Sequence, residues 1–230
     1  MTSKGSSTRK NSVAKDKRDT SGARSSEWTK IKQQLARAAQ EKNISLRGVR
    51  IAAAIACALR HIDQEPVLVG GAAVEFYTKG AYTTRDIDMI APGGPKLKDM
   101  MAQLGFDRRG KDFIHKKLNI YIEFPSETLG AGEKTSIIEV DGVELEIISI
   151  EDLIIDRLNA YKFWKSSIDG VNAMILMELG ENDEEITERK AHDADVLDAL
   201  DHIRIVRERV IRQRLSKTEA SELIEKFIKR

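Results

Sequence analysis

The chain has 230 residues, of which 41% are hydrophobic and 33% are charged, and its formal net charge is +1 at pH 7. This length allows one domain with an accessory part, or two small domains, and the near-neutral charge excludes a protein that binds nucleic acid by overall charge alone. No apolar run reaches the roughly 18 residues that span a membrane, the N-terminus lacks the apolar core of a signal peptide, and the single cysteine cannot form an internal disulfide. A cytoplasmic protein is therefore expected.

The first segment, residues 1–26, has a composition unlike the rest. It carries seven Lys and Arg residues against Asp16 and Asp19, a net charge of +5, so the remainder of the chain carries −4. With hardly an apolar residue, it is predicted to be a disordered basic tail. Such a charge run is typical of a solvated tail and is also compatible with an arm that contacts RNA.

The next segment, residues 27–64, is predicted to be an N-terminal helical region, because its apolar residues have helical spacing. One helix is predicted from about Glu27 to Glu41 and a second from near Ser45 to Leu59.

A core region, 65–148, alternates short apolar runs with helix-length segments. Asp141-Gly142 is a strong signal for a two-residue hairpin turn between the last two strands. Strands are expected at 67–69, 86–90, about 113–115, 120–124, 137–140 and 143–148, and helices at 72–79 and 96–104.

From residue 149 to residue 230 the pattern is helical. Ser149 to Asp152 resembles a capping box, with Asp152 in the place of the usual Glu, and an apolar stripe follows it. Further helices are predicted at about 170–179, 187–214 and 217–229. The expected fold class is α+β: a mixed β-sheet with flanking helices, followed by a helical C-terminal part.

A glycine pair, Gly70-Gly71, follows the apolar run Val67-Leu68-Val69. Glycine permits a tight backbone bend and close approach of a phosphate, and the start of a following helix offers free N–H groups. A simple turn is the alternative interpretation.

Two acids, Asp86 and Asp88, alternate with apolar residues on the next predicted strand. Side chains two residues apart on a strand share a face, roughly 7 Å apart, and two such carboxylates repel by about 2 kcal/mol at an effective dielectric near 20. A divalent cation between them reverses the sign, and hard oxygen ligands suit magnesium. The alternative is the solvated face of a strand.

A third acid on a neighbouring strand would complete a metal site. Glu123 lies within Ile120-Tyr-Ile-Glu-Phe124 and is preferred. Glu146 is its rival, although Glu144 and Glu146 together look more like an exposed strand face.

These residues, in this order, resemble the nucleotidyltransferase superfamily that shares the DNA polymerase β palm. The signature is Gly-Gly or Gly-Ser, then Asp-x-Asp on the next strand, then a single acid on a later strand. Tyr82-Thr-Thr-Arg-Asp-Ile-Asp88 looks especially like the AbiEii toxin-like and related minimal nucleotidyltransferases. The resemblance covers about residues 66–170.

The resemblance implies a nucleotidyltransferase-like fold and a metal-dependent transfer from a nucleoside triphosphate such as ATP. Asp86, Asp88 and Glu123 would bind two Mg²⁺ ions. The implied nucleotide-binding residues are Gly70, Gly71, Thr84, Arg85, Arg157 and Lys162. Arg157 stands where the toxin relatives usually have Lys, and Asp169 where they often carry a further acid.

The acceptor stays open among RNA, a protein side chain and a small molecule such as an antibiotic. The basic tail, or the C-terminal arginines, could contact RNA, although an acidic stretch before these arginines also favours pairing within the chain. They are Arg204, Arg207, Arg209, Arg212 and Arg214. A protein of the same fold without catalysis, used for binding or regulation or as a toxin–antitoxin component, is the alternative function.

Overall fold

A computed structural model describes residues 20–228 of the chain. Helix α1 (Thr20–Ala39) begins before the predicted Glu27, so the C-terminal end of the segment predicted to be disordered is helical. The rest of that predicted tail, residues 1–19, lies outside the described residues. Within residues 20–228, no helix is long and apolar enough to cross a membrane.

One mixed sheet of seven strands forms the centre of the described chain, in the order β3-β4-β5-β2-β1-β7-β6. β1 runs parallel to β7 and β2 parallel to β5, whereas the other neighbours are antiparallel. The strands are β1 (Val67–Val69), β2 (Asp86–Ile90), β3 (Asp107–Arg109), β4 (Asp112–His115), β5 (Ile120–Glu123), β6 (Thr135–Val140) and β7 (Val143–Ile148).

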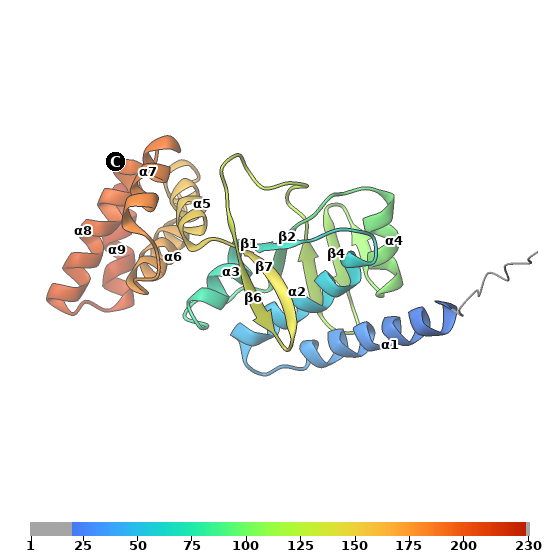
Figure 1. Ribbon diagram of the computed structural model, residues 1–230. Coiled ribbons are helices and arrows are strands. Elements are labelled where there is room, and N and C mark those ends of the chain that lie inside the picture. Colours follow the sequence, from blue (N-terminus) through green and yellow to red (C-terminus); the bar gives the residue numbers. More distant parts are fainter. Residues whose placement is uncertain (1–19, 229–230) are drawn as a thin grey trace, which may run out of the picture.

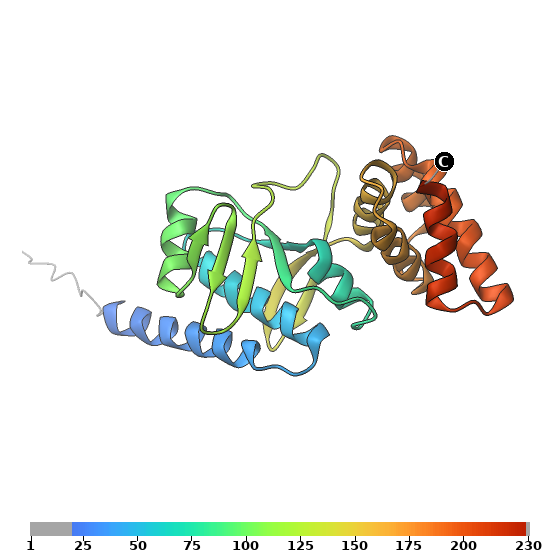
Figure 2. The same ribbon diagram turned by 180° about the vertical axis from the view of Figure 1, so that it is seen from behind.

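Helices cover the sheet and extend beyond one end of it. α2 (Ile44–Arg60) packs against α1 and against β2, β6 and β7, which buries its alanine-rich face. Figures 1 and 2 show α1 and α2 side by side along the sheet, with the C-terminal helices gathered at one end. The remaining helices are α3 (Gly70–Tyr77), α4 (Pro95–Gln103), α5 (Ile150–Phe163), α6 (Ser167–Glu178), α7 (Glu184–Asp193), α8 (Leu197–Gln213) and α9 (Lys217–Ile228). The predicted α+β class, a mixed sheet with flanking helices and a helical C-terminal part, is confirmed.

One local prediction was wrong, and one strand was not predicted. The helix predicted at 187–214 is two helices, because Asp195 takes a left-handed backbone conformation (φ 56°) and Val196 turns into the core. Asp tolerates that conformation better than most residues. The exposed strand β3 was not predicted, because its sequence Asp-Arg-Arg has no apolar residue.

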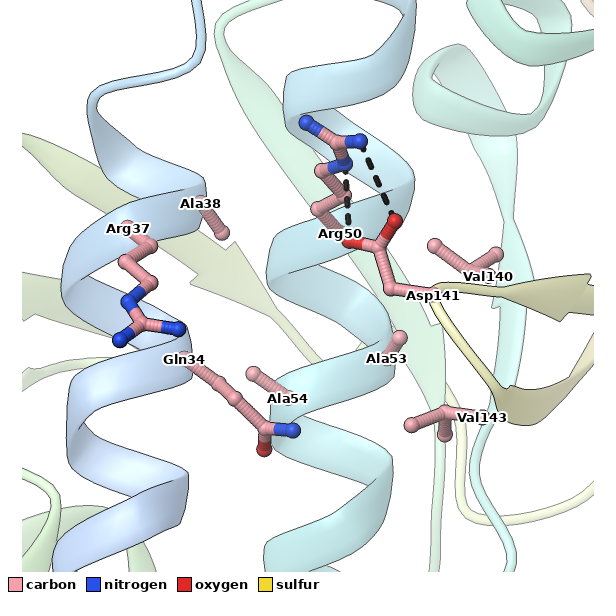
Figure 3. Close-up of a pocket in the computed structure, with 9 residues that line it drawn as sticks. All are labelled: Gln34, Arg37, Ala38, Arg50, Ala53, Ala54, Val140, Asp141 and Val143. Carbon is pink, nitrogen blue, oxygen red and sulfur yellow. Dashed lines mark hydrogen bonds and ion pairs between the residues drawn. The ribbon is translucent and has the colours of Figure 1, made fainter.

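The turn between β6 and β7 has the predicted geometry and is tied to α2. Asp141 (φ 52°) and Gly142 (φ 80°) both have positive φ, as a type I′ hairpin turn requires. The Asp141 carboxylate pairs with the Arg50 guanidinium, with Nε to Oδ2 at 2.9 Å. Figure 3 shows this pair at the side of a pocket of about 370 Å³ between α1, α2 and the turn.

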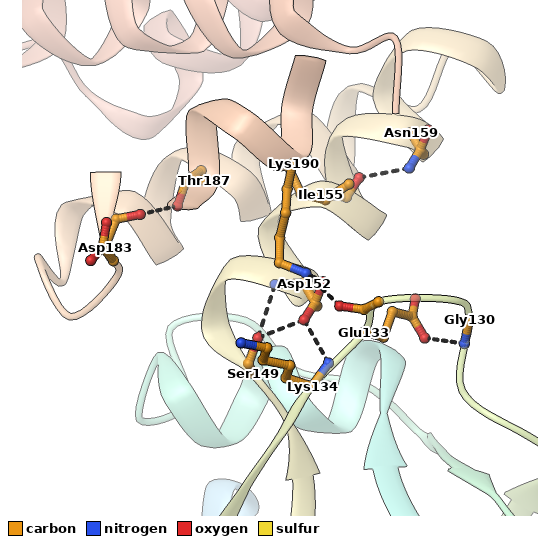
Figure 4. A network of polar contacts seen from close by, with 11 residues as sticks. Gly130, Glu133, Lys134, Ser149, Asp152, Ile155, Asn159, Asp183, Thr187 and Lys190 are labelled. Carbon is orange, nitrogen blue, oxygen red and sulfur yellow. Dashed lines mark hydrogen bonds and ion pairs between the residues drawn. The ribbon is translucent and has the colours of Figure 1, made fainter. Parts of the chain in front are cut away.

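A buried ion pair holds the loop between β5 and β6 against the C-terminal helices (Figure 4). The Asp152 carboxylate accepts hydrogen bonds from the Lys134 N–H (2.9 Å) and the Ser149 hydroxyl (2.9 Å), and it pairs with Lys190 Nζ at 2.7 Å. Lys190 also donates to the Gly132 carbonyl at 2.8 Å. This network, Asp152–Lys190 with Lys134 and Gly132, joins α5 and α7 to the chain that leads into β6.

Candidate active site

The two predicted acids of β2 share one face of the sheet. Ile87 and Met89 are buried on the opposite face, whereas Asp86 is exposed and Asp88 half-buried. In the register of the sheet, Asp88 lies beside Glu123 of the parallel strand β5. Neighbouring strands are about 4.8 Å apart, so the backbone holds these two acids as direct neighbours.

The register separates the two rivals for the third acid. Glu146 of β7 is the neighbour of Val67 in β1, and β1 stands between β7 and β2. Glu146 is thus two strands away from Asp88, about 10 Å or more, whereas Glu123 is one strand away. The sheet therefore favours Glu123 as the third acid.

The glycine pair lies directly against these acids, where β1 passes into α3. Gly70 has φ +61°, and a Cβ there would come within 2.9 Å of Asp88 Cγ. The Gly71 N–H acts to lower the pKa of the Asp88 carboxylate, and a Cβ on Gly71 would lie 3.1 Å from Thr84 Cβ. Gly70 therefore needs glycine for its backbone angle and for this close approach, whereas a side chain at Gly71 would require Thr84 to shift slightly.

Burial and neighbouring charges shift the pKa of the Asp88 carboxyl group. Burial raises the pKa of Asp88 above its ordinary value of 3.8, and the negative charges of Glu123 and Asp86 raise it further. The Gly71 N–H and the Arg157 guanidinium oppose this rise. A positive charge that enters between these carboxylates would therefore relieve both the repulsion and the cost of burial.

Arg157 reaches this site from α5. Its guanidinium is largely buried and pairs with Asp156 and with Asp169, the latter at 2.7 Å. Burial acts to lower the pKa of Arg157, but the two carboxylates hold it above its usual value. The predicted further acid, Asp169, is thus the partner of the arginine and fixes its position.

The other three predicted nucleotide-binding residues differ in their surroundings. The Thr84 N–H donates to Glu75 Oε2 at 3.0 Å, which holds the turn before β2 against α3. The Arg85 guanidinium lies 6.0 Å from the centre of the Tyr121 ring. Lys162 instead pairs with Asp198 at 2.9 Å and with Asp195, among the C-terminal helices.

Two residues beside Glu123 were not predicted from the sequence. Asp112 of β4 is the antiparallel neighbour of Glu123, and Lys111, in the turn before it, forms an ion pair with the Glu123 carboxylate. Asp112 lies at the start of a strand that was predicted only from Phe113 onwards. Because Phe113 and Ile114 are adjacent apolar residues, no alternation in the sequence extended the predicted strand to Asp112.

The chemistry of these acids fits a hard divalent cation. Asp86, Asp88 and Glu123 offer carboxylate oxygens, and the missing Cβ of Gly70 lets the Asp88 carboxylate lie directly against the backbone. Among residues 20–228, however, no three His, Cys, Asp or Glu side chains gather closely enough to hold a metal ion. Glu123 is directed to Lys111 instead.

Of the C-terminal arginines, Arg204 and Arg207 are paired within the chain. Arg204 pairs with Glu184 (3.1 Å) and Glu188 (3.0 Å), and Arg207 lies 3.9 Å from Glu184. These pairs join α8 to α7. Arg209, Arg212 and Arg214 are exposed.

A scan of protein-family models and a search of curated proteins find no match to this sequence. Among solved structures, the chain is similar to an antigenic nucleotidyltransferase-like protein from Paracoccidioides brasiliensis. The two share 13% sequence identity at a TM-score of 0.46, over 66% of this chain and 90% of the other. At this degree of similarity, function has to be inferred from the residues of the site itself.

Proposed function

We propose that this chain is a magnesium-dependent nucleotidyltransferase, which moves a nucleoside monophosphate from a nucleoside triphosphate to an acceptor hydroxyl and releases pyrophosphate. The observation that carries the proposal is the register of β2 and β5, which sets Asp88 beside Glu123. A left-handed glycine, Gly70, packs against the same carboxylate. A solvated strand face would not require that close approach.

In the proposed reaction the acceptor oxygen attacks the α-phosphorus in line. Its bond to phosphorus forms as the bond to the bridging oxygen of pyrophosphate breaks, and the hydroxyl proton passes to solvent. Magnesium ions, held by Asp86, Asp88 and Glu123, would supply positive charge that stabilises the attacking and leaving oxygens.

The backbone at Gly70 and Gly71 would approach the phosphates, and Arg157 would add charge from α5. Thr84 and Arg85 would contact the nucleotide beside the acids. Lys162 could contribute only after leaving Asp195 and Asp198.

The alternative is a protein of this fold that binds without catalysis, for regulation or as a toxin–antitoxin component. The ion pair between Lys111 and Glu123 favours this alternative, as does the finding that no three metal-binding side chains gather closely enough within residues 20–228. The close packing of Gly70 against Asp88 and the burial of charged Arg157 favour the enzyme.

A transfer assay separates the two functions. The full chain is incubated with Mg²⁺ and each labelled triphosphate, together with cellular RNA, cellular proteins or aminoglycosides as acceptors. The enzyme is expected to label one acceptor class, and Asp86→Ala/Asp88→Ala is expected to reduce transfer by roughly a thousandfold, since metal ligation contributes several kcal/mol. Transfer that persists in this variant would reject the assigned site.

A further inference from the structure

We propose that Lys111 is an internal counter-cation, which holds Glu123 until it yields this carboxylate to a divalent ion. The inference rests on the proposed function, because it concerns access to the third acid of the same site. It assigns a regulatory part to the hairpin of β3 and β4.

The hairpin geometry brings Lys111 to the acids. In the antiparallel register, Arg109 of β3 lies opposite Asp112 of β4. Gly110, at φ 63°, and Lys111 form the turn between them. Because Asp112 is the neighbour of Glu123 in the sheet, the turn lies at the position where the side chain of Lys111 can reach across to β5.

The charges around Lys111 resemble those that a bound cation would meet. Glu123 pairs directly with Lys111, and Asp112 and Asp88 are the neighbours of Glu123 on the two adjacent strands. The ammonium therefore stands in the combined field of three carboxylates, two of which are proposed metal ligands.

This ion pair is suited to release. The Lys111 side chain is 71% exposed, whereas the Glu123 side chain is 21% exposed. An exposed lysine contributes little to a pair, because its charge is screened by water and its long side chain loses conformational freedom. A divalent ion, with twice the charge, can therefore compete for Glu123 at modest cost.

A titration of the full chain with Mn²⁺, followed by electron paramagnetic resonance, tests the inference independently of catalysis. Lys111→Ala should bind Mn²⁺ roughly fivefold more tightly than the wild type, because the competing cation is gone. Lys111→Arg keeps the ion pair and should retain the wild-type affinity. Lys117→Ala, which removes an exposed lysine from the turn after β4, should also match the wild type.

The variant Glu123→Gln, which lacks the carboxylate, shows whether Lys111 changes the Mn²⁺ affinity by competing for Glu123. In Glu123→Gln, the added change Lys111→Ala should raise the remaining Mn²⁺ affinity by clearly less than it does in the wild type. An equal gain in that background, or equal affinities of wild type and Lys111→Ala, would overturn the inference alone. If Mn²⁺ binding of the wild type did not depend on Asp86 and Asp88, the proposed function would fail, and this inference with it.

Discussion

At the scale of single residues, Glu75 is notable because an ionisable side chain is buried in α3. It is 4% exposed in α3, and Oε1 is buried with no hydrogen-bond partner within the described residues. Oε2 accepts the Thr84 N–H, and Thr84 packs against Gly71. Glu75 thus positions the turn that precedes the acids of β2, and burial is the cost of that role.

The stability of the protein should depend on pH through Glu75. Burial raises the pKa of Glu75 above 4.5, although the Thr84 N–H and the charge of Arg47 oppose the rise. The folded state then binds more protons than the unfolded state above pH 4.5, so this contribution to stability falls as pH rises through the folded-state pKa. Glu75→Gln should remove that fall.

Urea unfolding of both proteins between pH 4 and pH 8 measures this difference. Glu139→Gln, which alters an exposed strand residue, serves as the control and should follow the wild type. A pH dependence of Glu75→Gln parallel to that of the wild type would contradict the explanation.

At the scale of elements, the start of α5 separates what the sequence could predict from what it could not. The helix begins as predicted, with the Asp152 N–H donating to the Ser149 hydroxyl. In a complete capping box, the Ser149 N–H would also donate to the Asp152 side chain. Here the Ser149 N–H donates to the Lys134 carbonyl instead. The shorter Asp152 side chain instead pairs with Lys190, a contact that its position in the sequence does not reveal.

Local signals predicted other elements for physical reasons. The bounds of β1 and β2 agree with the prediction, since both are short apolar or alternating runs between clear breakers. The break between α7 and α8 at Asp195 could not be predicted in this way, because the sequence there contains neither Gly nor Pro. It depends on the packing of α7 and α8, which the pairs of Arg204 with Glu184 and Glu188 secure.

Breaking the Asp152–Lys190 pair should destabilise the protein. The two side chains are 6% and 18% exposed, so Lys190→Met leaves a buried carboxylate without its counter-charge, at a cost of about 3 kcal/mol. Urea unfolding at pH 7 measures the loss. Lys98→Met, on the exposed side of α4, should change stability by less than about 0.5 kcal/mol.

Adding Asp152→Asn to Lys190→Met tests the cause of that loss. Since the neutral amide removes the unpaired charge, the double variant should recover part of the stability. Equal or greater destabilisation of the double variant would show that the charge is not responsible.

At the scale of the whole molecule, the site exists only because of the order of strands. Asp88 and Glu123 are far apart in sequence and become neighbours because β5 inserts beside β2. Both Glu123 and Glu146 alternate with apolar residues, so the local pattern could only rank them. The order of strands then distinguishes them, because it places Glu123, and not Glu146, on the strand next to Asp88. Lys111 could not be predicted as a partner, because its role depends on the pairing of β4 with β5.

Asp86 and Asp88 are proposed to bind the metal-associated phosphates of a nucleoside triphosphate. Calorimetric titration of the full chain with non-hydrolysable analogues of the four triphosphates, in Mg²⁺, tests it without knowledge of the acceptor. The matched variants are Asp86→Asn/Asp88→Asn and Glu139→Gln/Glu144→Gln, which remove the same charge from the same face of the sheet.

We predict that the wild type and Glu139→Gln/Glu144→Gln bind at least one analogue equally well. Asp86→Asn/Asp88→Asn should bind it at least roughly tenfold more weakly, because even partners of metal ligands change metal affinity by roughly 10- to 100-fold. Failure of the wild type to bind any of the four analogues, or equal binding by the two variants, would contradict the account.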